Sequence, residues 1–69
     1  MEAEVPEIVK DARRFLGEGY RAYESVSFGQ PMRDIRKPTG CLVPDSEEGA
    51  AYLKRLWGAM TAIQFLEGL

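Results

Sequence analysis

The apolar residues in the first third of the chain recur with the period of an α-helix. From Val5 to Val26 they fall within an arc of about 160° on a helical wheel, and charged residues occupy the opposite side. Pro6 suits a first-turn position, and the acidic residues Glu2 and Glu4 suit the positive end of the helix dipole. The pattern predicts an amphipathic helix over about residues 5–26.

Two glycines leave a second interpretation of this segment open. Gly17 and Gly19 would each cost about 1 kcal/mol relative to alanine inside a helix, and residues 15–19 would also suit a helix end followed by a turn. The apolar positions from 20 to 26 continue the same stripe without a shift in phase. Because of this continuity we favour one helix.

The last third of the chain opens with a helix-capping signal. Asp45 is placed to cap the helix, Glu48 follows three residues later as its capping-box partner, and Pro44 comes just before. The apolar positions that follow keep the helical period up to Leu66. We therefore predict a second helix over about residues 46–67.

The apolar face of this second helix spans about 200°, which is more than one partner helix can cover. A two-helix protein would leave part of that face exposed, and a continuous exposed apolar surface typically marks an interface. Gln64 lies within the stripe and needs a hydrogen-bond partner, for which its own copy across a two-fold axis is one candidate. The predicted interface residues are Leu53, Leu56, Trp57, Met60, Ile63 and Gln64.

Proline and glycine cluster between the two predicted helices, so we expect residues 27–44 to form an irregular connector. The predicted fold is an all-α helical hairpin in a single domain. At 69 residues such a domain has little stability from its core alone. Cys41 is the only cysteine, so no intrachain disulfide can form, and we expect a homo-oligomer or docking on another protein.

Most catalytic and metal sites lack their usual residues in this chain. There is no histidine to activate Cys41 or a serine, or to complete a zinc site. No glycine-rich segment continues into the Lys-Ser/Thr of a phosphate-binding loop, and no loop carries the alternating carboxylates of a calcium site. We expect no catalytic residue, cofactor or metal. Cys41 is expected as a small buried hydrophobe, with a reactive role left open.

The formal net charge of −2 argues against a general polyanion binder. The densest positive cluster is Arg33, Arg36 and Lys37, which is the candidate contact for an anionic partner, although solvated loop charges would give the same pattern. No apolar run is long enough to span a bilayer, and the acidic start is unlike a signal peptide, so a cytoplasmic location is expected. The arginine excess and the lack of asparagine fit a heat-adapted source or a GC-rich genome equally.

These observations favour a non-enzymatic protein–protein interaction module that acts through the apolar face of the second helix. An adaptor, a regulatory or inhibitory subunit and a small assembly component all fit this description. The alternative is a small nucleic-acid-associated protein that uses Arg33, Arg36 and Lys37.

Overall fold

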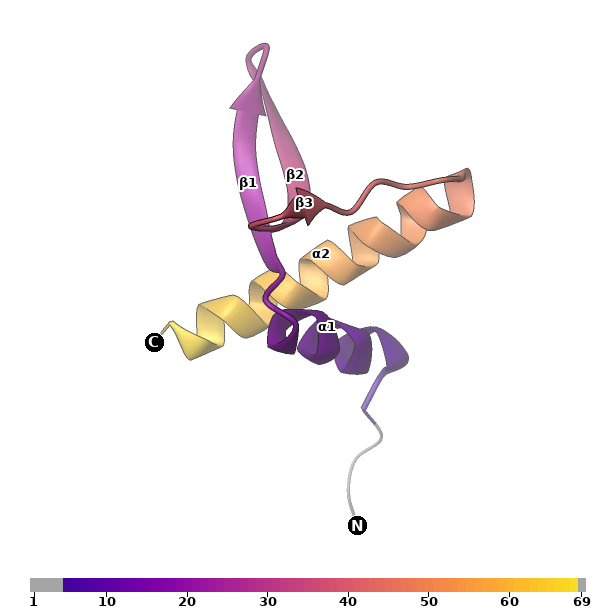
Figure 1. Cartoon of the computed structure of the whole chain (residues 1–69), viewed down its shortest axis with the longest axis vertical. Helices are drawn as coiled ribbons and strands as arrows, with labels where there is room; N and C mark the ends of the chain where they lie inside the picture. The colour runs from indigo at the N-terminus through magenta and orange to yellow at the C-terminus, as the bar shows by residue number, and fades with distance from the viewer. Residues whose placement is uncertain (1–4, 69) are drawn as a thin grey trace.

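The computed structural model describes residues 5–68, so Glu2 and Glu4, expected at the first helix start, lie outside this range. Over the described residues the chain forms two helices and a three-stranded antiparallel sheet (Figure 1). The elements in chain order are α1 (Glu7–Gly17), β1 (Arg21–Ser27), β2 (Gln30–Lys37), β3 (Gly40–Cys41) and α2 (Glu47–Glu67). This is an α+β fold, and the predicted all-α helical hairpin is wrong.

The first helix ends at Gly17 instead of continuing to residue 26. Gly19 has a φ of +99°, a left-handed conformation that glycine adopts without steric cost. The amides of Gly19 and Tyr20 then donate to the carbonyls of Leu16 and Phe15 at 3.1 and 3.0 Å, which satisfies two of the carbonyls in the last turn of the helix. The second interpretation of this segment, a helix end followed by a turn at residues 15–19, is therefore the one that the chain adopts.

A β-hairpin replaces the last part of the predicted first helix, residues 21–26, and most of the predicted irregular connector, residues 27–44. β1 and β2 pair antiparallel from Arg21 opposite Arg36 to Ser27 opposite Gln30. The two residues between them, Phe28 and Gly29, both have positive φ angles, of 52° and 77°, as a tight type I′ hairpin turn requires. Figure 1 shows this hairpin extending well away from the two helices.

The second helix spans Glu47–Glu67, against the expected residues 46–67. Its cap is Ser46 and not Asp45. The Ser46 hydroxyl accepts a hydrogen bond from the amide of Gly49 at 3.0 Å, which satisfies one free donor of the first turn. Neither helix among the described residues is long and apolar enough to cross a membrane.

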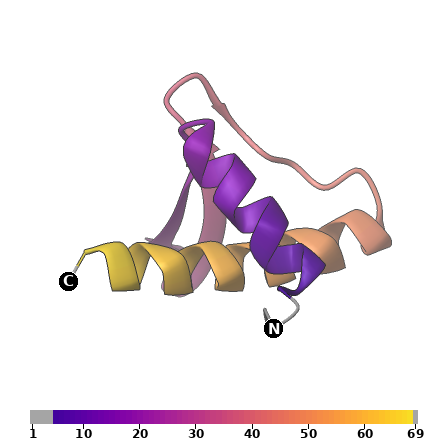
Figure 2. The ribbon, with the colours of Figure 1, turned by 90° about the horizontal axis from the view of Figure 1, so that it is seen from below.

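Helix α2 contacts both the base of the hairpin and α1, which crosses it (Figures 1 and 2). Every element except the two-residue β3 contributes to the small core. Its buried residues are Ala12, Ala22, Ile35, Leu56 and Met60. The wide apolar face of α2 is therefore divided between two partners, α1 and the sheet. Packing against two partners covers an arc that one partner helix could not cover.

Candidate binding groove

An open groove of about 350 Å³ lies between β2, the segment 42–44 that leads out of β3, and the first half of α2. The amide of Leu42 donates to the carbonyl of Ile35 at 3.0 Å, so this segment starts against β2 before it crosses to the helix. The lining residues are Pro31, Arg33, Asp34, Ile35, Leu42, Pro44, Ala50, Leu53, Lys54 and Trp57.

The inner surface of the groove is apolar. Ile35 is only 3% exposed, and Leu42, Leu53 and Trp57 are half-buried side chains that pack against the core. Leu53 and Trp57 are four residues apart on α2, a spacing that places them side by side on one helical face. The groove is thus an extension of the core that remains open to solvent.

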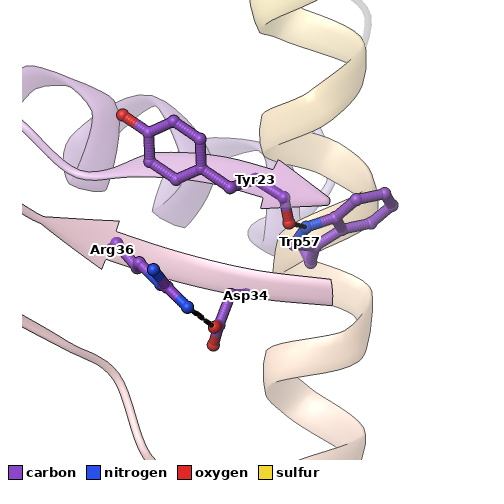
Figure 3. A network of polar contacts seen from close by, with 4 residues as sticks. All are labelled: Tyr23, Asp34, Arg36 and Trp57. Atoms are coloured by element: carbon purple, nitrogen blue, oxygen red, sulfur yellow. Dashed lines mark hydrogen bonds and ion pairs between the residues drawn. The ribbon is translucent and has the colours of Figure 1, made fainter. Parts of the chain in front are cut away.

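Trp57 is held in a fixed orientation in the wall of the groove. Its indole Nε1 donates a hydrogen bond to the carbonyl oxygen of Tyr23 at 2.9 Å (Figure 3). The guanidinium carbon of Arg33 lies 4.8 Å from the centre of the indole ring, which is a cation–π distance. Because the indole N–H is already satisfied, the ring offers the groove an apolar surface with no unmet polar group.

The charges at the groove entrance are predominantly positive. Arg33 and Lys54 are exposed and come from opposite sides, one from β2 and the other from α2. Asp34 is bound to Arg36, with Nη2 to Oδ2 at 2.7 Å and Nε to Oδ2 at 3.0 Å (Figure 3). This hydrogen bond and the charge of Asp34 raise the pKa of Arg36 above its ordinary value. The pairing offsets the one acidic residue of the groove.

The predicted basic cluster is not a single surface. Successive residues of a strand face opposite sides of the sheet, so Arg33 and Lys37 of β2 lie on one side and Arg36 lies on the other. Lys37 places its ammonium 5.3 Å from the ring centre of Tyr20, while Arg33 lies over Trp57. The three cations therefore point to three different surroundings.

The predicted interface residues of α2 are also separated. Leu56 and Met60 have no exposed surface and lie inside the core. Leu53 and Trp57 face the groove, whereas Ile63 borders a different hollow between the ends of the two helices. The side chain of Gln64 forms hydrogen bonds with the main-chain N–H and C=O of Ala22 in the same chain. Its hydrogen-bond partner is therefore Ala22 and not a second copy of Gln64.

The structure corrects the expectation for Cys41 and adds Lys54 to the predicted site residues. Cys41 is exposed at the end of the sheet, and not a buried hydrophobe as expected. Lys54 is one of the two cations that line the groove. Its position on the helical wheel is that of a solvent-exposed residue, so its place in the groove follows only from the tertiary structure. Within residues 5–68, no group of three metal-ligating side chains comes together.

Comparison of the chain with models of known protein families, with characterised proteins and with solved structures found no match.

Proposed function

We propose that this chain is a non-enzymatic protein-interaction module that binds a short peptide segment of a partner protein in the groove beside Trp57. One observation carries the proposal: an apolar groove that is continuous with the core has a cation on each side of its entrance, Arg33 and Lys54. A tryptophan and an arginine in contact at such a site are the residue types that most often dominate binding energy at protein interfaces.

The groove specifies the chemistry of its partner. Its volume of about 350 Å³ is near the lower end of the range for ligand pockets, which suits one or two apolar side chains. The cations at the entrance favour an Asp or Glu next to those side chains, since complementary charge steers association and selects partners. The partner is therefore an extended or helical segment with an apolar anchor and at least one flanking carboxylate.

Nucleic acid fits this surface less well. Phosphate binding requires several cations along one face, whereas the structure divides Arg33, Arg36 and Lys37 between two faces and binds Arg36 to Asp34.

The experiment is selection of a random peptide library displayed on phage against the immobilised chain. We expect enrichment of peptides that combine an aromatic or aliphatic residue with a neighbouring Asp or Glu. Calorimetry with a selected peptide should then show that Lys54→Glu weakens binding about tenfold or more, as loss of one partner of a charge pair does. Lys10→Glu is the matched control, because Lys10 is an exposed lysine of α1 outside the groove.

Three results would contradict the proposal. One is selection without enrichment. Another is equal weakening by Lys54→Glu and Lys10→Glu, which would show that only net charge matters. The third is salt-sensitive binding of a single-stranded oligonucleotide by a chain that binds none of the selected peptides.

A further inference from the structure

The two edges of the sheet are protected to different degrees. On one side, β3 is only two residues long and is followed by Pro44. The rest of that edge belongs to β2, in which Ile35 points its carbonyl toward Leu42 and away from β1. By alternation Pro31 points the same way, so a residue without an N–H occupies the exposed part of this edge. A further strand would find few donors there.

The other edge is β1, and most of it is open. The Gln64 side chain binds both main-chain groups of Ala22, which therefore point away from β2. The alternation of a strand aims the N–H and C=O of Glu24 and Val26 in the same outward direction. Among the described residues, no side chain or strand bonds to these groups. Neither proline nor lysine, the residues that commonly protect an edge, occurs in β1.

We propose that a second copy of this chain pairs with β1 along this edge, antiparallel and about a two-fold axis at Ser25. The open edge begins at Tyr23, after Gln64 closes the position of Ala22, and ends at Ser27, before the turn at Phe28. Ser25 is the midpoint of that five-residue stretch. Antiparallel pairing about a two-fold axis at this midpoint matches the whole open stretch of one copy to the whole open stretch of the other, so the same outward groups on both copies are paired.

The register follows from the directions of the main-chain groups. With the axis at Ser25, Glu24 of one copy lies opposite Val26 of the other, and the reverse pair is equivalent. Both residues point outward, so each pair exchanges two hydrogen bonds. Two Ser25 residues then face each other without direct hydrogen bonds, at the short Cα–Cα separation of about 4.5 Å that is typical of such pairs.

The side chains accept this register. Glu24 meets Val26 and not a second glutamate, so like charges are not opposed directly across the junction. Tyr23 lies opposite Ser27. The 76% exposed Val26 loses solvent contact, which removes the most exposed apolar side chain of β1 from water. The groove lies at the other side of the sheet, beside β2, and remains open in the dimer. The inference is thus independent of the function proposed above.

Cysteine cross-linking tests the register directly. In a Cys41→Ser background, Ser25→Cys places two thiols across the axis at a distance that a disulfide can bridge. We expect air oxidation to give a covalent dimer on a non-reducing gel. Ser27→Cys is the matched control, because its two copies are separated by four residues along the strands and cannot reach each other. Equal cross-linking of the two variants, or none in Ser25→Cys, would overturn the register.

A charge pair tests the same contact without a new bond. Val26→Glu places a glutamate opposite Glu24 twice in the dimer, whereas Val26→Lys places a lysine there. Both substitutions are at an exposed position, so each variant should keep the wild-type circular dichroism spectrum.

The readout is the mass in solution by light scattering over a dilution series. We expect twice the mass of one chain for the wild type, and a dimer dissociation constant about tenfold larger for Val26→Glu than for Val26→Lys. A wild-type chain that is monomeric at the highest attainable concentration, or equal dissociation constants for the two variants, would overturn the proposal.

Discussion

The side-chain amide of Gln64 forms hydrogen bonds with both main-chain polar groups of Ala22. Its Oε1 accepts from the Ala22 N–H at 2.6 Å, and its Nε2 donates to the Ala22 carbonyl at 3.1 Å. A residue near the end of α2 thereby takes the place that a neighbouring strand would take at the edge of β1. This contact joins the sheet to the helix and sets where the open part of the edge begins.

We predict that Gln64→Met destabilises the protein. Methionine keeps a similar length but forms neither hydrogen bond, so the free energy of unfolding should fall by about 2 kcal/mol, at about 1 kcal/mol for each bond. Urea denaturation at fixed protein concentration measures it. Gln30→Met at the exposed start of β2 is the control and should change stability by less than about 0.5 kcal/mol. Equal effects of the two substitutions would show that the Ala22 contact contributes no stability.

The hairpin turn should be improved by substitution. Phe28 has a φ of 52° and a fully exposed side chain, so it bears the steric cost of a left-handed conformation without compensating burial in the chain. Phe28→Asn should raise the free energy of unfolding by about 1 kcal/mol, because asparagine suits this turn position. Gly29→Ala should lower it by a similar amount, since φ is +77° there. Thermal denaturation of monomeric samples checks both signs, and a loss of stability in Phe28→Asn would contradict this account of the turn.

Stability at alkaline pH should depend on Tyr52. Its hydroxyl donates to Oδ2 of Asp11 at 2.8 Å and joins α2 to α1. Burial raises the pKa of Tyr52 above its usual value of about 10, and the hydrogen bond to Asp11 and the charge of Asp11 raise it further. The folded state thus favours the protonated phenol. The hydrogen bond from Tyr52 therefore contributes fully to stability below the pKa that Tyr52 has in the unfolded chain. This contribution is lost as the pH rises through the higher pKa that Tyr52 has in the folded protein.

The stability difference between the wild type and Tyr52→Phe should therefore shrink as the pH rises above about 10. Chemical denaturation over a pH series measures this difference. Asp11→Asn should in turn lower the pKa of Tyr52 toward its usual value, which an absorbance titration of the phenolate detects. A stability difference that stays constant with pH would contradict the assigned contact.

Local signals predicted the helices better than the strands. The capping residues before Glu47 and the long apolar period indicate α2, although Asp45 and Ser46 are adjacent candidates and only the structure shows that Ser46 caps. Residues 20–26 were predicted as helix because so short a segment has too few apolar positions to distinguish a helical period from that of a strand. Their extended form depends on pairing with β2, which is a contact between residues distant in sequence. The hairpin turn at Phe28 and Gly29 was also not predicted, because an aromatic residue is uncommon at a tight turn.

The candidate site could be predicted only in part, for a similar reason. The helical period identified the apolar face of α2, including Leu53 and Trp57, but not which part of it the sheet and α1 cover. Leu56 and Met60 are the centre of that face and hence the centre of the core. Arg33 was a candidate for its charge, yet its position over Trp57 requires the strand.

The fluorescence of Trp57 gives the most direct test of the groove, because it is the only tryptophan in the chain and lies in the groove wall. The titrant is a selected acidic peptide that contains no tryptophan. The account predicts that emission shifts to shorter wavelength and saturates as the peptide covers the indole, and that Lys54→Glu moves saturation to about tenfold higher peptide concentration. Saturable binding by calorimetry with an unchanged Trp57 spectrum would show that the peptide binds elsewhere, and would contradict the groove as the functional site.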